Sequence, residues 1–385
     1  MPGRKQLLTV VRWPVGGIRT YMRYVYGHMS DAWRVTILAV DTQESEALKH
    51  DAQAMGAELI FCGHGCHHAK GHLPLLQATW KLLAQRRFDL VQSQGFTAAT
   101  MVGAANMFFR VPHVLTVHGV LEERLLTGWK GQIKRTIANR TILGADMVYG
   151  VGRDILEHLH EQVPGFDPDG PKATVIPNGI ETSLYTVTDA VKGAFRKKAG
   201  LATGQFVFGS LGRFMQQKGL DCLIEAVATL DAMRGGADAY SVVAVGSGDY
   251  QHMYQELANQ KGVAHRFVFM PFQADAAEIY CDLDAVVMPS RWEAWALVPM
   301  EAMCSGVPLI ASDCMGLREA TADTPSLQFP TNDVEALANA MAALLDDDGS
   351  IRKSFSDFRP EAVRRFDVQQ TARCVEELFD GMLKG

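Results

Sequence analysis

The sequence predicts an α/β protein made of two doubly wound domains, each a parallel sheet with helices on its faces. Three observations predict this fold. Short apolar segments alternate with amphipathic helical stretches along almost the whole chain. The length of 385 residues is about twice that of a usual single domain. Prolines and glycines concentrate between Pro164 and Glu181, which marks a boundary between two series of elements.

Each series supplies the strands of one expected sheet of about six strands. In the first series we expect strands at 7–11, 35–40, 58–62, 90–92, 113–117, 147–150 and 174–176. In the second series we expect strands at 206–211, 241–245, 267–270, 285–288, 309–311 and 327–329.

Composition places the chain among globular proteins. It is 48% apolar and 21% charged, and its net charge of -6 gives no case for a nucleic-acid partner. Residues 1–185 hold 19 basic and 16 acidic side chains, whereas the remainder holds 18 and 27, which indicates different partners for the two halves.

Targeting signals are not evident in the sequence. No stretch reaches the roughly eighteen apolar residues of a membrane span. The apolar run at 7–11 is too short for a signal peptide, so we interpret it as a strand. Seven scattered cysteines, an odd number, indicate free thiols in a reducing cytoplasm.

The first strand-to-helix turn whose residues suit ligand binding follows residues 7–11. Ligands of doubly wound sheets bind beyond the carboxyl ends of the strands, so a site is expected at such turns. Here Gly16 and Gly17 permit a close approach that a side chain forbids, and the next helix offers free N–H groups to an anion. A tight turn that needs glycine for its own geometry is the alternative.

The second turn, 209–219, lies between strand 206–211 and a helix expected at 220–230. Arg213 and Lys218 bracket it, so a bidentate guanidinium and an ammonium converge on one anion, for which a diphosphate is the obvious candidate. It is not a Walker loop, because Lys218 is followed by glycine rather than Ser or Thr. Two solvated surface cations are the alternative.

The third turn, 289–308, contains two carboxylates. Glu293 follows strand 285–288, and Glu301 lies near the start of a helix that Pro299 begins. Carboxylates there accept hydrogen bonds and stay ionised, which suits the vicinal diol of a ribose or hexose.

Together these segments resemble family 4 of the retaining glycosyltransferases, over nearly the whole chain. The most specific parts are Val175-Ile-Pro-Asn-Gly-Ile-Glu181, the Gly-Arg-x4-Lys-Gly loop around Arg213, and the pair Glu293 and Glu301. The resemblance implies the GT-B fold, in which two Rossmann-like domains face each other across a cleft. It further implies an acceptor-binding domain at 1–175, a nucleotide-sugar-binding domain at 176–364 and a helix at about 365–385 that crosses back to the first domain.

The resemblance also implies roles for single residues. Arg213 and Lys218 match residues that bind the donor diphosphate, Glu301 matches one that binds the ribose, and Glu293 one that contacts sugar hydroxyls. His118 matches a residue that lies by the sugar at the reaction centre, although a lone histidine is more often structural. We expect catalytic roles for His118, Arg213, Lys218 and Glu293. Further donor-binding positions are expected at Gly16, Gly17, Gly246, Met270, Ala296, Leu297 and Val298.

The function implied is that of a metal-independent, retaining hexosyltransferase without a cofactor. It would move a sugar from a nucleoside-diphosphate sugar to a glycan or lipid-linked acceptor, in bacterial cell-envelope polysaccharide or glycolipid synthesis, in the cytoplasm. Two alternatives stay open. One is a nucleotide-sugar epimerase or hydrolase of the same fold, and the other is a non-catalytic subunit that binds nucleotide sugar.

The chain departs from the family pattern at two places. The family usually has Glu-Gly-Phe-Gly where this sequence reads Glu293-Ala-Trp-Ala296, which bears on the identity of the transferred sugar. The family often carries histidine in the segment that here reads Asp89-Leu-Val-Gln-Ser-Gln94.

Other signals favour structural interpretations. The segment from Cys62 to His72 holds zinc-type ligands, but its spacing is not that of a standard zinc site. Asp282 and Asp284 imitate a metal-binding Asp-x-Asp, yet they immediately precede strand 285–288, where cap and turn acids are expected. The acids at 346–348 are interpreted as a solvated helix end.

Residues 129–143 are the last signal of the sequence. They combine Lys130, Lys134, Arg135 and Arg140 with three isoleucines, as in helices that lie on an anionic membrane surface. An ordinary half-buried helix fits the pattern equally well.

Overall fold

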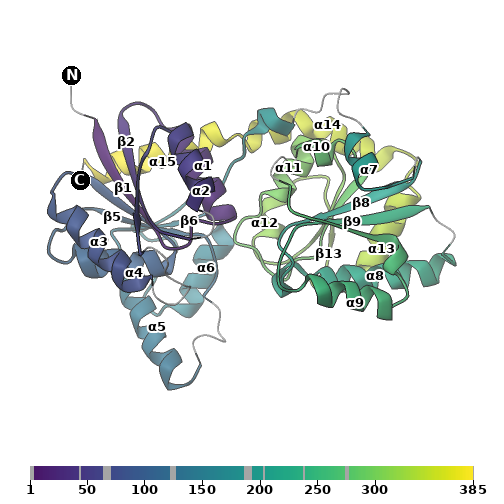
Figure 1. The fold of residues 1–385 in the computed structure, drawn as a ribbon, viewed down its shortest axis with the longest axis horizontal. Helices are drawn as coiled ribbons and strands as arrows, with labels where there is room; N and C mark the ends of the chain where they lie inside the picture. The colour runs from purple at the N-terminus through teal and green to yellow at the C-terminus, as the bar shows by residue number, and fades with distance from the viewer. Residues whose placement is uncertain are drawn as a thin grey trace. The chain divides into compact units, whose positions relative to one another are not determined.

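The computed structural model describes residues 4–42, 45–63, 71–121, 127–185, 193–202, 204–236, 239–273 and 277–384. They form two compact α/β units, each with its own parallel sheet (Figure 1). The first unit extends to Gly179 and resumes at Val368, and the second runs from Ile180 to Asp367. The sequence placed these boundaries at 175 and 365, within the same Pro- and Gly-rich stretch and near the same helix.

The first unit is built on a seven-stranded sheet in the order β3-β2-β1-β4-β5-β6-β7. Its strands are β1 (Lys5–Val11), β2 (Trp33–Val40), β3 (Glu58–Cys62), β4 (Leu90–Gln94), β5 (His113–Val117), β6 (Met147–Gly150) and β7 (Ala173–Val175). Its helices are α1 (Gly17–Gly27), α2 (Ser45–Ala54), α3 (His72–Ala84), α4 (Phe96–Asn106), α5 (Gly128–Leu143), α6 (Arg153–Gln162) and α15 (Val368–Met382). The strand order reverses between β1 and β4, which places the switch point of the sheet there.

The second unit has a six-stranded sheet in the order β10-β9-β8-β11-β12-β13. Its strands are β8 (Phe206–Leu211), β9 (Tyr240–Val245), β10 (Phe267–Met270), β11 (Ala285–Met288), β12 (Leu309–Ser312) and β13 (Leu327–Phe329). Its α-helices are α7 (Ala194–Lys198), α8 (Leu220–Arg234), α9 (Gln251–Gln260), α10 (Ala277–Tyr280), α11 (Val298–Cys304), α12 (Leu317–Ala320), α13 (Val334–Leu345) and α14 (Ser350–Arg365). Short 3-10 turns lie at Thr182–Tyr185, Gln216–Lys218 and Ala264–Arg266.

The expected fold class is confirmed, because both sheets are parallel and helices follow their strands. Strands that are buried on both faces are mostly apolar, as in β9, whose six residues are all buried and of which Ser241 alone is a small polar residue. Every expected strand is present within the described residues, seven in the first sheet and six in the second. β4 continues two residues beyond its expected end at Gln92.

Helix α15 joins the first unit although the second unit separates it in sequence from that unit (Figure 1). Its Phe379 ring packs edge-on against Trp33 of β2, and Asp380 pairs with Lys5 of β1 at 2.6 Å. At its start, the Thr371 hydroxyl donates to the carbonyl of Pro177. Helix α15 is therefore attached to the first unit near both ends of the helix. No described helix is both long and apolar enough to cross a membrane.

Candidate active site

Three loops meet at the carboxyl edge of the second sheet, where β8, β9 and β11 lie side by side. Backbone hydrogen bonds join them. Phe214, after β8, donates to the carbonyl of Ser247, after β9, at 2.9 Å. Arg291, after β11, donates to the carbonyl of Gln217 at 2.8 Å. The loop that carries Arg213 and Lys218 is thus held from both neighbouring strands.

Glycine allows this close packing at two positions. A Cβ on Gly246 would lie 1.9 Å from the carbonyl oxygen of Gly212, far inside van der Waals contact. Gly219 has φ +65° and packs equally tightly against the Pro289 carbonyl. Gly246 also donates from its amide to the carbonyl of Met270, at the end of β10, at 2.9 Å. The structure therefore brings Gly246 and Met270 together beside the Arg213 loop.

The two cations of the loop have different surroundings. Arg213 is exposed, and among the described residues no carboxylate pairs with it. Lys218 Nζ lies 2.6 Å from Glu293 Oε1, with exposed side-chain fractions of 24% and 8%. The sequence singled out both residues of this ion pair but gave no sign that they touch.

Glu293 is anchored by more than Lys218. The Ser290 hydroxyl donates to Glu293 Oε1 at 2.7 Å, and the Glu293 amide donates to the carbonyl of Met315 at 3.0 Å. Arg291 forms a bidentate pair with Asp221 at the start of α8, with distances of 2.9 and 2.7 Å. Ser290 and Arg291 are functional neighbours that the sequence analysis missed, since only the pairing of β8 with β11 brings them to this loop.

Glu301 lies on α11, which has Pro299 in its first turn as expected. Its carboxylate is buried and accepts a hydrogen bond from the Tyr280 hydroxyl at 2.6 Å. The Tyr280 ring is in turn held edge-on by Tyr185. Tyr280 was not anticipated, because nothing in its local sequence sets it apart from a core aromatic residue.

The remaining candidates of this loop lead into α11. Ala296 is buried beside the buried Trp295, and Leu297 precedes the helix that begins at Val298. The amide of Glu301 donates to the carbonyl of Leu297 at 3.0 Å. Ala296, Leu297 and Val298 are thus fixed close to Glu301 by the first turn of the helix.

His118, Gly16 and Gly17 belong to the first unit, whereas the other nine candidates belong to the second. His118 follows β5, and its Nε2 lies 2.6 Å from Gln94 Oε1. Its ring packs edge-on against Tyr21 of α1, with 4.7 Å between ring centroids. Burial lowers the pKa of His118 to about 3, so its imidazole is neutral at physiological pH. Gly16 has φ +56° and precedes α1.

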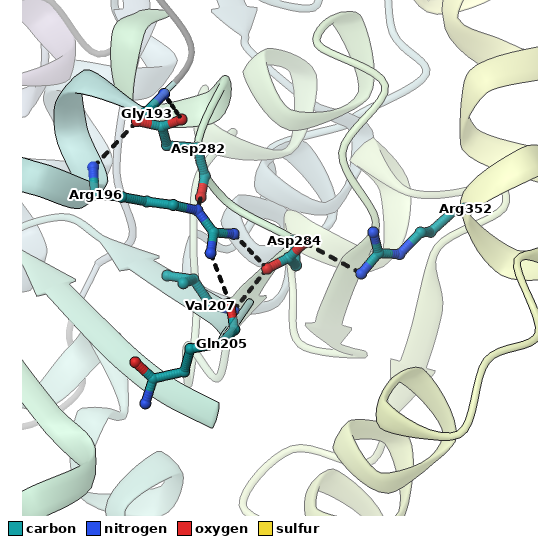
Figure 2. Close-up of polar contacts among 7 residues, drawn as sticks. All are labelled: Gly193, Arg196, Gln205, Val207, Asp282, Asp284 and Arg352. Atoms are coloured by element: carbon teal, nitrogen blue, oxygen red, sulfur yellow. Dashed lines mark hydrogen bonds and ion pairs between the residues drawn. The ribbon is translucent and has the colours of Figure 1, made fainter. Parts of the chain in front are cut away.

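The acids of the Asp-x-Asp sequence hold the second unit together (Figure 2). Asp282 accepts from the amides of Gly193 and Phe195, which caps α7. Asp284 pairs with Arg196 at 2.6 Å and with Arg352 at 3.1 Å. The interpretation of these acids as cap and turn residues is confirmed.

No group of three or more His, Cys, Asp or Glu suited to a metal ion occurs in the part of the chain that the structure describes. Most of the segment from Cys62 to His72 lies outside the described residues. The described cysteines are free thiols. In the acidic run at 346–348, Asp347 accepts from the amides of Ile351 and Arg352 at the start of α14.

Two family models match successive parts of the chain. A model described as "Glycosyl transferase 4-like domain" matches residues 16–179. A model described as "Glycosyl transferases group 1" matches residues 191–361. The two matches correspond to the two structural units.

Curated relatives include glycosyltransferases and synthases from bacteria. A D-inositol 3-phosphate glycosyltransferase of Corynebacterium urealyticum is 29% identical over 94% of this chain and 90% of its own length. The lipopolysaccharide core biosynthesis mannosyltransferase LpsB of Rhizobium meliloti is 26% identical over 55% of this chain. The chain spans 61% of the length of LpsB and 60% of a second D-inositol 3-phosphate glycosyltransferase, from Nocardia farcinica.

Solved structures share the fold over the whole chain. HepE from Anabaena, in complex with UDP and glucose, superposes with a TM-score of 0.83 at 21% identity and covers 98% of this chain and 100% of its own. WaaG, a glycosyltransferase involved in lipopolysaccharide biosynthesis, superposes with a TM-score of 0.74 at 16% identity and covers 98% and 100%. The two domain matches in succession and the shared fold show that this chain belongs to the GT-B glycosyltransferases, with a glycosyl transferase 4-like domain followed by a group 1 domain.

Proposed function

We propose that the protein is a retaining, metal-independent hexosyltransferase of family 4 that uses a nucleoside-diphosphate sugar as donor. One observation carries the proposal. Arg213 is exposed without a carboxylate partner among the described residues, in a loop that also presents Lys218 and that two neighbouring loops brace. A guanidinium and an ammonium held on a rigid backbone suit the two phosphates of such a donor.

The chemistry follows from where charge develops. The bond between the sugar's anomeric carbon and the diphosphate oxygen breaks, and its electron pair stays on the diphosphate. The acceptor oxygen forms the new bond on the same face, and its proton passes to the departing phosphate oxygen. Fixed cations aimed at that oxygen stabilise the transition state more than the ground state. Arg213 and Lys218 would supply this charge, which is why we propose that no metal ion is required.

The carboxylates are proposed to bind hydroxyl groups of the donor. The Glu301 carboxylate is oriented by the Tyr280 hydroxyl, as an acceptor for the ribose diol needs. Glu293 is proposed to accept from hydroxyls of the transferred sugar. Its pairing with Lys218 means that one cation serves both the diphosphate and this carboxylate.

The glycine turn of the first unit fits a ligand that approaches the backbone. A Cβ on Gly17 would meet no atom within 4 Å, and its φ lies outside the left-handed region. Neither packing nor backbone conformation therefore requires glycine at this position. We propose that Gly16 and Gly17 leave room for the donor at the start of α1.

The relatives support the donor and acceptor classes. The HepE structure holds UDP and glucose, and the relatives include the lipopolysaccharide mannosyltransferase LpsB. We propose a glycan or lipid-linked acceptor in cell-envelope polysaccharide or glycolipid synthesis, with the enzyme in the cytoplasm and at the membrane surface.

The test is a thermal-shift screen with UDP-, GDP- and ADP-sugars, followed by transfer assays. We expect one donor class to raise the melting temperature, and Arg213→Ala and Lys218→Ala each to lower transfer by about a hundredfold or more while the fold stays intact. Retained transfer would remove the diphosphate role of these residues. Sugar nucleotide that disappears without an acceptor would identify a hydrolase or epimerase, and tight binding without turnover a binding subunit.

The membrane contact is proposed through α5, at 129–143. In this helix Trp129, Ile133 and Ile137 are 72%, 52% and 45% exposed, and steps of four residues place them on one face. The helix carries four basic side chains and no acidic one. Its buried residues are Gly131 and Ile142, so the apolar stripe does not face the core of its unit.

An exposed apolar stripe beside cations is the pattern of a helix at the surface of an anionic bilayer. Tryptophan and isoleucine enter the headgroup region, and each nearby basic residue contributes about 1 kcal/mol. Because α5 is positively charged, an anionic lipid surface suits this face of the helix better than an apolar protein groove without acidic residues. Placing α5 at the membrane would bring the first unit to a lipid-linked acceptor.

The contact is tested by flotation of the full chain with vesicles of phosphatidylglycerol or of phosphatidylcholine. We expect salt-sensitive binding to the anionic vesicles only, and its loss when Trp129 and Ile133 are changed to serine. Phe272→Ser in the second unit, which is also exposed, is the matched control and should bind as the wild type does. Absent binding, or equal binding by the α5 variant, contradicts the proposal.

A further inference from the structure

A buried chain of polar side chains runs behind His118 in the first unit. It begins at Thr9 of β1, includes Tyr21 and Tyr26 of α1 and Gln92 and Gln94 of β4, and reaches Thr116 of β5. All six are buried, whereas His118 is half-buried. In the central strands of an α/β sheet such positions are ordinarily apolar, so this group calls for a physical explanation.

Within this chain each glutamine amide has a defined direction. The Tyr26 hydroxyl donates to Gln92 Oε1 at 2.7 Å. Gln94 Nε2 donates to the Tyr26 hydroxyl at 2.7 Å and to the Thr9 hydroxyl at 3.1 Å. Both N–H groups of Gln94 are thereby used, and its oxygen is the atom that faces His118 Nε2 at 2.6 Å.

The direction of the Gln94 amide decides where His118 carries its proton. An amide oxygen only accepts, so Nε2 of His118 must be the donor. In a neutral imidazole with hydrogen on Nε2, Nδ1 has a lone pair and no hydrogen. No described residue forms a hydrogen bond with Nδ1 of His118.

The neighbours of the ring leave it uncharged. Burial lowers the pKa of His118 to about 3. The group that faces it from α1 is Tyr21, whose own pKa burial raises to about 12, and Tyr26 behind Gln94 has a pKa well above its ordinary value. From β4 the ring meets only the neutral amide of Gln94. Tyr21, Tyr26 and Gln94 are therefore neutral over the working pH range, and burial is what lowers the pKa of His118.

We infer that Gln94 is a positioning residue, which holds His118 as its Nε2–H tautomer and leaves Nδ1 as an acceptor for a hydroxyl of a bound sugar. The inference rests on the proposed transferase function only for the identity of that hydroxyl. A histidine at position 94 could donate to His118 or accept from it, according to its own tautomer, whereas the Gln94 oxygen can only accept. Glutamine at position 94 therefore fixes the direction of the hydrogen bond with His118, whereas a second imidazole would allow either direction.

Nitrogen NMR of the full chain with labelled histidine tests the tautomer directly. The His118 signal is assigned by its loss in His118→Gln. At pH 7 we expect a protonated Nε2 and an unprotonated Nδ1. A proton on Nδ1 overturns the inference whether or not the protein transfers sugar, so this outcome is separate from a failure of the proposed function.

Gln94→Glu reverses the effect by charge. A buried carboxylate beside Nε2 raises the pKa of His118, so both ring nitrogens carry hydrogen below that new pKa and Nδ1 can no longer accept. We expect kcat of this variant to fall about tenfold at pH 6 and to recover as pH rises, with wild-type kcat flat over the same range. A variant profile as flat as that of the wild type contradicts the inference.

A matched pair of variants separates positioning from simple support of the fold. Gln94→Met and Ser93→Ala both remove buried hydrogen bonds of β4, but Ser93 bonds His113 and lies outside the chain that orients Gln94. We expect Gln94→Met to release the tautomer and lower kcat about tenfold, with donor KM changed less. Ser93→Ala should keep the tautomer and kcat within about twofold of wild type. Equal losses of kcat in both variants would show a structural role and refute positioning.

Discussion

Lys218→Met tests whether the lysine binds phosphate or only holds Glu293. The two side chains pair at 2.6 Å, so any loss of function in Lys218→Met has two possible causes. Glu293→Gln and the double variant complete a cycle that separates them. In the double variant, position 293 carries a neutral amide, so no buried carboxylate is left without a cation.

The expected stability changes follow from burial. Removing one partner of a buried ion pair costs about 3–5 kcal/mol, because the other charge is left uncompensated. Lys218 is 24% exposed, so water reaches the pair, and we expect about 2 kcal/mol for Lys218→Met. Ser290 still donates to Glu293 in that variant. The double variant should be more stable than Lys218→Met by about 1 kcal/mol or more, since its neutral amide needs no cation.

Binding distinguishes the two roles. A charge-assisted hydrogen bond to phosphate contributes about 1.5–3 kcal/mol, or roughly ten- to hundredfold in Kd. We expect calorimetry with the stabilising nucleoside diphosphate to show this loss in Lys218→Met and equally in the double variant, whereas Glu293→Gln binds at least as tightly as wild type. If the double variant regains the affinity of Glu293→Gln, Lys218 acts through Glu293 and the diphosphate role is refuted.

Five further changes have defined outcomes. Gly246→Ala forces a Cβ to within 1.9 Å of a carbonyl oxygen and should lower the free energy of unfolding by about 2 kcal/mol or more, measured by urea denaturation. Gly17→Ala, whose Cβ meets nothing, should keep its stability but weaken donor binding; equal stability losses would contradict this contrast. Burial lowers the pKa of His113 to about 4, so the unfolded chain binds its proton first as pH falls below about 6.5. Stability attributable to His113 should therefore drop by about 3 kcal/mol between pH 6.5 and 4, and His113→Gln should flatten that slope. Tyr280→Phe removes the hydroxyl that donates a hydrogen bond to buried Glu301, so the KM for the sugar donor should rise more than kcat falls. A fall in kcat that exceeds the rise in KM would contradict this role. Transfer should persist in excess chelator, and dependence on added manganese would argue for a metal.

Local pattern explains why so much of the fold could be predicted. Strands such as β5 and β8 have the bounds that their largely apolar runs indicated, because a strand covered on both faces is mostly apolar. β4 was expected to end at Gln92, since polar residues ordinarily leave the core. It continues to Gln94 because hydroxyls from β1, α1 and β5 satisfy both amides.

The sequence by itself determined the two-unit α/β architecture, the boundary region between the units and the turns that carry Arg213, Lys218, Glu293 and Glu301. These features are local, and apolar periodicity, glycine and proline report them directly. Tertiary structure alone decided the partners of these residues. Lys218 meets Glu293 across 75 residues of chain because β8 and β11 are adjacent in the sheet, and strand order is a property that no local pattern encodes.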